Sequence, residues 1–475
     1  MTEKLVWGLF IITTIIIASI ILLLGKIQPA GDIVEYYGST VSLLSHGNVS
    51  LTDKDQKEIE KVLSPEYFKD PQYYIRGSDG KRYPVHFVFY SFLLLPARIF
   101  LNILQANPLL SFPVTNLIIL TLTVYFIFKY YIRENIRRLQ LLVLVYFSPL
   151  LFFITWPGPD LYVASFLLLA LYSLFAKQYF ITTMLVVLAS WHSQPIGFIA
   201  IAVYIYYLYE SIKPKIDAAL IIQAVLLGIL ILLPYLYNYV QFGVWTPWVL
   251  IDNGWTKING FGLQNIRIGK FLEQFLDPNI GLVWYAPVVF FIGFYTLVRL
   301  IKKEIHLLVC AIFFLFTALL YQTNPAWHYG TAGFGPSRHI LFFLPFLIYL
   351  ALRGLASFRY SGIKIILLIL LGVWQIFSLD INGFLLPDFR NTLYHSPYAE
   401  YLLNNYPELY SPTSEIFIDR TNHTDFDYLT SAVYKNGELC KKAYILSDDV
   451  SKLITECNFI PKNNLNKTEG IYVNY

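Results

Sequence analysis

Two carboxylates shortly after the first apolar segment are the side chains of this chain best suited to acid–base chemistry. Asp32 and Glu35 lie three positions apart, a spacing that puts both on one face where the chain is helical. At the level of the lipid head groups, a carboxylate can take the proton of a reacting hydroxyl. We expect Asp32 to be this general base; the alternative is the ordinary solvated acid beyond a membrane helix. Glu35 and Tyr36 are expected to contact substrate, although a solvated position on the same turn is the simpler interpretation of Glu35.

A third acid, Asp160, follows the turn Pro157-Gly158-Pro159 at the start of an apolar segment. An acid at a helix N-terminus is favoured by the helix dipole alone, which is the ordinary interpretation. The functional one places Asp160 beside Asp32 as a second catalytic carboxylate that positions an acceptor or helps to hold a divalent ion. No metal-ligand spacing such as His-Glu-x-x-His is present, so the sequence leaves a divalent cation open and assigns no ligand to it.

One arginine and two histidines complete the candidate site. Arg338 opens a later apolar segment, where a charge is costly unless it is paired. We expect it to bind an anion, with a phosphate as the natural partner of a guanidinium; the alternative is an interfacial anchor whose side chain reaches water. His86 and His328 are expected on the same side as substrate contacts, although a lone histidine at an interface is more often structural.

The composition places the chain in a lipid bilayer. It has 475 residues, of which 56% are hydrophobic and only 14% charged, against about 25% charged in an average soluble domain. A net charge of +4 is too small to indicate nucleic acid. The chain contains no P-loop, no Gly-rich dinucleotide motif and no soluble region large enough for a nucleotide-sugar domain. A lipid-linked substrate is therefore favoured over a nucleotide-linked one.

The apolar segment 87–104 decides the orientation of the helices. If it crossed the membrane, the basic loop 129–138 would lie outside, against the positive-inside rule. If it lies on the outer leaflet, that loop and the later short basic loops all lie inside. We therefore expect an all-α polytopic membrane protein of about eleven spans, with the N-terminus inside and the C-terminus outside. The expected spans are residues 5–25, 113–129, 139–155, 161–176, 179–192, 195–210, 216–237, 282–299, 305–321, 337–352 and 363–379.

The C-terminal part of the chain differs from the rest in composition. Residues 1–380 are expected to form the transmembrane domain, including a long first outer loop at 26–104 that contains a charged helix at residues 52–63. Residues 381–475 are expected to form a small mixed α/β extracytoplasmic domain. Alternating residues at 415–418 and 442–446 predict short strands. Cys440 and Cys457 can pair only in an oxidising compartment, and the sequence leaves that pairing open.

Several segments, taken in order, resemble the GT-C-fold glycosyltransferases, the superfamily of protein mannosyltransferases and lipid A aminoarabinose transferases. Gly31 to Tyr36 resembles the Gly-Asp-x-x-x-Tyr opening of the family's first outer loop, and residues 79–86 are similar to the segment before its interfacial helix. Residues 281–287 resemble its Gly-Leu-x-x-Tyr-x-Pro entry into a later span. Residues 327–330 and 334–338 are similar to its aromatic and Gly-x-Arg segments, with Pro336 and Ser337 inserted before Arg338.

The resemblance implies an inverting transferase with the catalytic aspartate at Asp32 and a second outer acid at Asp160. The expected partners are a polyprenyl-phosphate-linked sugar, a glycan, lipid or protein acceptor, and membrane lipid, with no nucleic acid. The expected location is the inner or plasma membrane, with the site on its extracytoplasmic side. A transporter or flippase of a lipid-linked sugar is the alternative, but it should show internal repeats and mid-membrane charges that this sequence lacks. A non-catalytic scaffold is a third interpretation.

Overall fold

The protein is described here by a computed structural model and is mostly helical. The described residues are 2–24, 27, 29, 31–63, 73–212, 218–252, 256, 260–325, 327–329, 335–357, 361–381, 393–424, 430–446, 457 and 470–475. Within them, five helices are long and apolar enough to cross a membrane. They are α1 (Glu3–Leu24), α5 (Ser111–Tyr130) with the 3-10 turn η2 (Pro108–Leu110), α9 (Gln194–Ile212), α10 (Ala218–Phe242), and η5 (Ile340–Phe342) with α17 (Leu344–Ser357).

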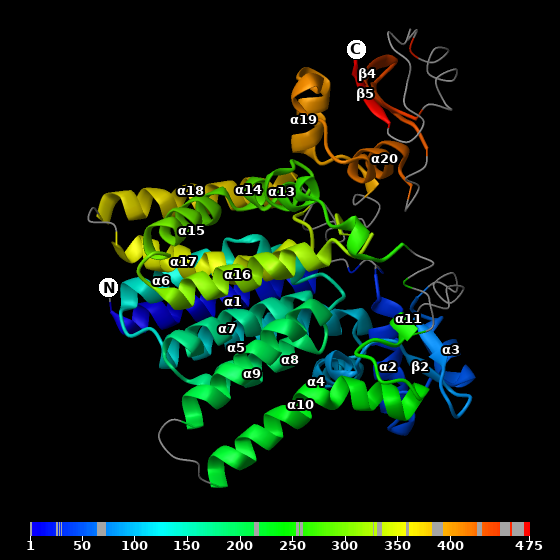
Figure 1. The fold of residues 1–475 in the computed structure, drawn as a ribbon, viewed down its shortest axis with the longest axis vertical. Coiled ribbons are helices and arrows are strands. Elements are labelled where there is room, and N and C mark those ends of the chain that lie inside the picture. The colour runs from blue at the N-terminus through cyan, green and yellow to red at the C-terminus, as the bar shows by residue number, and fades with distance from the viewer. Residues whose placement is uncertain are drawn as a thin grey trace.

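Shorter apolar helices complete a bundle in which α1, α5, α7, α8, α9 and α16 lie side by side (Figure 1). Many of the bundle residues point apolar side chains outward, which is compatible with a membrane protein; in α1, for example, Ile15 and Leu23 are exposed. The remaining helices of this part are α4 (Phe89–Ile103), α6 (Asn135–Tyr146), α7 (Asp160–Phe175), α8 (Tyr179–Ser190), α15 (Pro287–Leu300), α16 (Ile305–Tyr321) and α18 (Ser361–Ile381).

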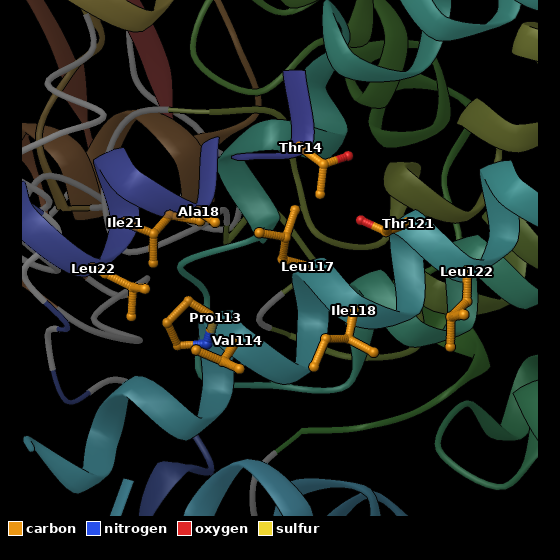
Figure 2. A pocket seen from close by; sticks show the side chains of 10 residues that line it. All are labelled: Thr14, Ala18, Ile21, Leu22, Pro113, Val114, Leu117, Ile118, Thr121 and Leu122. Carbon is orange, nitrogen blue, oxygen red and sulfur yellow. The ribbon is translucent and has the colours of Figure 1, made fainter. Parts of the chain in front are cut away.

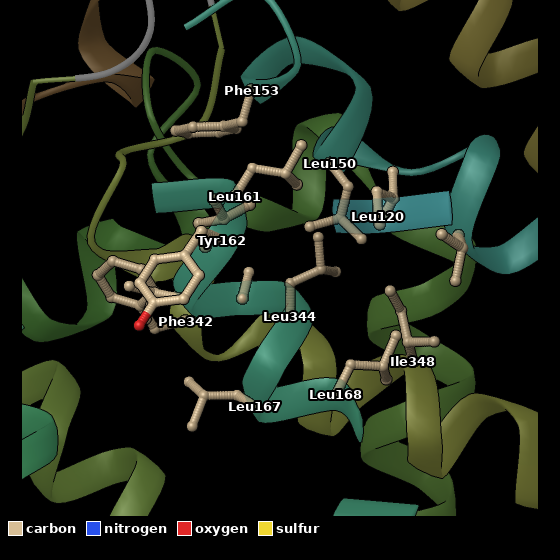
Figure 3. Close-up of a cluster of buried hydrophobic side chains, with 14 of the residues drawn as sticks. Leu120, Leu150, Phe153, Leu161, Tyr162, Leu167, Leu168, Phe342, Leu344 and Ile348 are labelled. Atoms are coloured by element: carbon tan, nitrogen blue, oxygen red, sulfur yellow. The ribbon is translucent and has the colours of Figure 1, made fainter. Parts of the chain in front are cut away.

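Helix α7 is at the centre of the hydrophobic core. It packs against α5, α8 and α17, so apolar residues cover its whole circumference instead of one face. Leu161 and Leu168 of α7 meet Leu120 of α5 and Ile348 of α17 in this core (Figure 3). The first residue of α7 is Asp160, so the packing of this helix fixes one candidate site residue at the end of the bundle.

One end of the bundle carries the N-terminus and the basic loops. The Glu3 carboxylate forms an ion pair with Arg138 at 2.7 Å, which places the start of α1 beside the start of α6. Glu304 and Arg353 likewise pair at 2.6 Å between α16 and the last turns of α17. The basic loop 129–138 is thus at the same end of the bundle as the N-terminus (Figure 1).

The opposite end carries the small elements of the first long loop, shown in blue in Figure 1. The turn of a two-stranded hairpin is tied to the last turn of α10, because the main-chain N–H of Ser78 donates to the carbonyl of Gln241 at 2.8 Å. Helix α4 is seen nearly end-on in Figure 1, whereas the bundle helices run across the picture. The elements here are α2 (Ile33–His46), α3 (Asp53–Ile59), β1 (Tyr74–Arg76), β2 (Arg82–Pro84) and α11 (Val249–Asp252).

Several predicted elements have different ends from those expected; the span predicted at 282–299, for example, is divided at Ala286 between α14 (Leu282–Tyr285) and α15. The charged helix predicted at 52–63 is present as α3, which is capped by Thr52 and ends at Ile59. The span predicted at 139–155 is divided: α6 ends at Tyr146, and a 3-10 turn, η3 (Pro149–Phe153), follows. Pro149 has no N–H to continue the helix. The next N–H, that of Leu150, donates to the hydroxyl of Ser148 at 3.3 Å.

The C-terminal part combines short helices with a three-stranded antiparallel sheet of order β3-β4-β5. The strand predicted at 442–446 is confirmed by β4, but the strand predicted at 415–418 is wrong, because these residues form the first turns of α20. A disulfide joins Cys440 and Cys457. The elements are α19 (Pro397–Asn405), η7 (Pro407–Leu409), α20 (Ser414–Asn422), β3 (Ala432–Asn436), β4 (Leu439–Ile445) and β5 (Ile471–Asn474).

This C-terminal part packs on the segment of the chain that precedes α15. The segment contains η4 (Leu263–Asn265), α13 (Ile268–Leu276) and α14 (Leu282–Tyr285). Asn279 contacts the C-terminal part through both atoms of its amide: the NH2 group donates to Tyr410 Oη at 2.6 Å, and the oxygen accepts from Ser396 N at 2.7 Å. Lys270 of α13 pairs with Glu415 of α20 at 2.5 Å.

Candidate functional site

Asp32 is the N-terminal cap of α2, and its carboxylate remains available. Its carbonyl accepts the main-chain N–H groups of Glu35 and Tyr36 at 3.1 and 3.2 Å, but its side chain does not cap the helix. The residue is half-buried, and within the described part of the chain its carboxylate has no hydrogen-bond partner. Asp32 is therefore a carboxylate held in place by its main chain, and none of the described residues occupies its oxygens.

Gly31 brings this carboxylate against the loop that precedes α7. Its φ of +53° is in the left-handed region that favours glycine. A Cβ at this position would lie only 3.3 Å from the ring of Trp156. The Gly31-Asp32 pair and the Trp156 loop, more than a hundred residues apart in sequence, are thus packed together.

The Trp156 loop in turn orients Asp160. The indole Nε1–H of Trp156 donates to Asp160 Oδ2 at 2.6 Å, across a turn so tight that a Cβ on Gly158 would lie 3.1 Å from the same oxygen. The amide of Asn116 on α5 donates to the carbonyl of Trp156 at 3.0 Å and accepts from the hydroxyl of Tyr90 on α4 at 2.8 Å. Asp160 is only 8% exposed, so it is a fixed carboxylate in a protein-lined environment.

Glu35 is engaged by His86 and is not a free base. Its Oε1 accepts the main-chain N–H of His86 at 2.5 Å, and its Oε2 lies 2.7 Å from the ring Nδ1. Burial raises the pKa of Glu35. Burial opposes protonation of His86, but the charge and hydrogen bond of Glu35, with a contribution from Asp32, outweigh it and raise the pKa of His86 to about 9. His86 is therefore a cation at neutral pH, and its ring is stacked under Trp248.

Arg338 provides a second cation in the same region. Its charge interacts with Asp160 and with His86. The main-chain N–H of Arg338 donates to the carbonyl of Tyr329 at 3.0 Å, while its buried guanidinium Nε has no partner. No ion pair joins Arg338 to another described residue. Among the described residues, no carboxylate therefore lies within ion-pair distance of the guanidinium.

Aromatic rings form the floor beneath these charges. Tyr36 packs edge-on against Tyr90 at 5.3 Å and His192 at 5.9 Å, and Tyr321 stacks on His339 at 4.7 Å. Tyr36, Tyr90 and Tyr321 belong to the same hydrophobic core cluster as the residues of α7, so the charged side chains lie next to apolar surroundings. Interactions between charges are stronger in such a low-dielectric setting than in water.

The structure brings six of the seven predicted residues together and places the seventh elsewhere. Glu35, Tyr36 and His86 are in contact, and the charges of Asp32, Asp160 and Arg338 interact with this group. His328 is fully buried and lies against the C-terminal part, with its Nε2 3.5 Å from Asp419 Oδ2. In the parts of the chain that are described, no group of three or more His, Cys, Asp or Glu side chains is arranged to hold a metal ion.

Sequence reasoning did not single out Trp156 and Asn116, which hold the Asp160 loop. For Trp156, the signal was its place four residues before Asp160, a spacing at which an indole N–H can reach the carboxylate. Asn116 had a weaker signal, as a lone amide in an apolar segment. A buried amide requires hydrogen-bond partners, so such a residue marks a tertiary contact without naming it.

An apolar groove of about 290 Å³ lies between α1 and α5 (Figure 2). Its lining includes Ile21 and Leu22 from the last turns of α1, and Pro113 and Leu117 from the first turns of α5. Asn116, in the same turns of α5, holds the Trp156 loop. The groove therefore begins close to the level of the charged group and extends toward the middle of the bundle.

Comparison of the chain with protein-family models, curated proteins and solved structures gave no match. The geometry of the charged group and of the groove is therefore the basis for a functional assignment.

Proposed function

We propose that this protein is a GT-C-like membrane glycosyltransferase that moves a sugar from a polyprenyl-phosphate donor to a hydroxyl of a glycan, lipid or protein. One observation carries the proposal. A carboxylate without a hydrogen-bond partner among the described residues, Asp32, and a guanidinium without an ion pair among them, Arg338, belong to one group at one end of a helix bundle. A base and an anion-binding cation are the two requirements of transfer from a sugar phosphate.

In this reaction Asp32 takes the proton of the acceptor hydroxyl while the hydroxyl oxygen attacks the anomeric carbon. The bond between that carbon and the phosphate oxygen breaks, and its electron pair leaves with the polyprenyl phosphate. Because attack and departure occur on opposite faces, the anomeric configuration inverts. Arg338 and the His86 cation stabilise the negative charge on the departing phosphate.

The other acids are proposed to have supporting roles. Glu35 keeps His86 charged through their 2.7 Å contact. Asp160, fixed by Trp156, is proposed to orient the acceptor beside Asp32. Tyr36 is proposed to face the sugar from the aromatic floor.

The membrane arrangement that fits this function has about eleven spans, with the charged group at the extracytoplasmic surface. The Glu3–Arg138 pair supports it, since it puts loop 129–138 on the same side as the N-terminus, in keeping with an interfacial α4 that does not cross. The Cys440–Cys457 disulfide supports an extracytoplasmic C-terminus, because structural disulfides persist in oxidising compartments.

The groove between α1 and α5 is proposed to hold part of the prenyl chain. Its lining is apolar, and its upper residues lie in the turns that lead to Asp32 and to the Trp156 loop. A chain seated there would direct its phosphate toward the charged group at the end of the bundle. Because the groove would hold the donor by its lipid, no soluble nucleotide-binding domain is needed.

The test is transfer of labelled sugar from polyprenyl-phosphate donors by the full chain in lipid nanodiscs. Asp32→Asn should lower turnover by about 10²- to 10⁴-fold, the usual contribution of a general base. Asp53→Asn, which changes an exposed acid at the start of α3, is the matched control and should remain close to wild type. Unchanged turnover in Asp32→Asn would remove Asp32 from the mechanism. Movement of the lipid-linked sugar across the membrane without any transfer would favour a flippase.

A further inference from the structure

Short hydrogen-bonded contacts determine where Arg338 lies. Its main-chain N–H donates to the carbonyl of Tyr329 at 3.0 Å. The hydroxyl of the preceding residue, Ser337, donates to the carbonyl of Trp327 at 2.8 Å, and Nδ1 of the following residue, His339, lies 3.2 Å from the same carbonyl. The main chain of Arg338 and the side chains of both its neighbours are therefore attached to residues 327–329.

Helix α20 of the C-terminal part holds residues 327–329 from the other side. The Tyr329 hydroxyl donates to Asp419 Oδ2 at 3.2 Å, and Nε2 of His328 lies 3.5 Å from the same oxygen. Trp327, fully buried, packs against Ile416. Asp419 and His328 are also fully buried, so these contacts form the interior of an interface.

We propose that α20 is a positioning element for the anion-binding arginine, and that Asp419 and Tyr329 are the positioning residues through which it acts on Arg338. This inference rests on the proposed function, because it assigns a catalytic consequence to the place of Arg338. A guanidinium that grips a phosphate must be held to within about 0.5 Å of the productive geometry. The C-terminal part is, on this view, a component of the active site although its own residues do not touch the substrate.

A purely structural role of the same contacts makes a different prediction. If Asp419 and Tyr329 only attach the C-terminal part to the bundle, their loss lowers stability without any specific relation to Arg338. If they position Arg338, the effect of their loss depends on whether the arginine is present. The two roles are therefore separated by a readout at position 338 and by the coupling between substitutions.

The substitution with the clearest control is Tyr329→Phe, which removes one hydroxyl and keeps the ring. Tyr434→Phe is the matched control, because the Tyr434 hydroxyl donates to Asn404 Oδ1 at 3.2 Å, the same length, inside the C-terminal part. Asp419→Asn, which removes the charge and keeps an oxygen that can accept from Tyr329, provides a second, milder variant at the same contact.

The first measurement does not depend on activity. Arg338→Cys is introduced into the full chain in nanodiscs and labelled with a membrane-impermeant maleimide. The native thiols do not compete, since Cys310 is buried and the other two cysteines are bonded. Tyr329→Phe should change the labelling rate by about two- to tenfold, the range expected for one lost hydrogen bond. Tyr434→Phe should leave the rate unchanged, and equal rates in all three proteins would overturn the proposal.

The second measurement is a double-mutant cycle on sugar transfer. Tyr329→Phe should raise KM for the polyprenyl-phosphate donor by about the same factor in the otherwise wild-type chain. In the Arg338→Gln background it should have no further effect, whereas additive effects would overturn the proposal. If the wild-type protein transfers no sugar but the labelling rate responds, the proposed function fails and the positioning of residue 338 by α20 stands.

Discussion

Replacing Glu35 by Gln should turn His86 from a cation into a neutral imidazole near neutral pH. The pKa of His86 in the folded protein is about 9, against an ordinary value of 6.5. The difference corresponds to about 3–4 kcal/mol of net stabilisation of the charged ring, on the scale of about 1.4 kcal/mol per pKa unit. Gln keeps the shape of Glu35 but not its charge, so burial then lowers the pKa of His86 below 6.5. At about pH 7.5, the protonated fraction of His86 should fall from nearly all molecules to roughly a tenth or less.

The assay is the pH dependence of KM for the polyprenyl-phosphate donor. Because the pKa of His86 is raised to about 9, its contribution to phosphate binding is present at neutral pH and is lost as the pH rises through about 9. In Glu35→Gln the loss should already be complete near neutral pH, with KM higher by about tenfold at about pH 7.5. Asp55→Asn, which disrupts the 3.0 Å carboxylate contact of His46, is the matched control. Identical pH profiles for Glu35→Gln and wild type would refute the reasoning.

Three further predictions concern the framework of the site. Gly31→Ala should lower the free energy of unfolding by about 1–2 kcal/mol, because φ is +53° and the new methyl group meets Trp156 at 3.3 Å; a thermal melt and a parallel transfer assay would measure it. Burial, together with the charges of Asp277 and Glu415, raises the pKa of Glu273 on α13 to about 8. Protonated Glu273 thus stabilises the packing of the C-terminal part fully below pH 4.5, and this contribution is lost as the pH rises through 8. Limited proteolysis of the wild type should therefore be faster at alkaline pH. In Glu273→Gln the rate of proteolysis should depend less on pH. Replacing both residues of the Cys440–Cys457 disulfide by Ser should destabilise the C-terminal sheet by about 2–4 kcal/mol, with reductant reproducing the effect on the wild-type melt.

The sequence identified which residues could do chemistry, but not which of them contact one another. Asp32 and Glu35 stood out because they lie just beyond the first apolar segment and three positions apart. That Glu35 would be occupied by His86, 51 positions later, depends on how the β1–β2 hairpin folds back over α2. Hydrophobic periodicity has no information about such a contact, so the different roles of the two acids could only come from the structure.

At His328 and at residues 415–418, too, the sequence alone did not determine the contacts that the structure shows. His328 was grouped with the other outer histidines by side of the membrane alone, and that criterion does not distinguish the charged group from the interface with α20. Residues 415–418 alternate over too short a stretch to separate a strand from one helical turn. In α20, Ile416, Phe417 and Arg420 are buried together against the C-terminal core and the bundle, a pattern that a helix accommodates.

The most direct test of the account is a cryo-EM structure of Asp32→Asn in nanodiscs with a polyprenyl-phosphate sugar bound. The account predicts the phosphate between Arg338 and His86, the sugar within hydrogen-bond reach of residue 32, and the prenyl chain along the groove between α1 and α5. Donor density at the other end of the bundle, beside the Glu3–Arg138 pair, or with residue 32 facing away from the sugar, would contradict it.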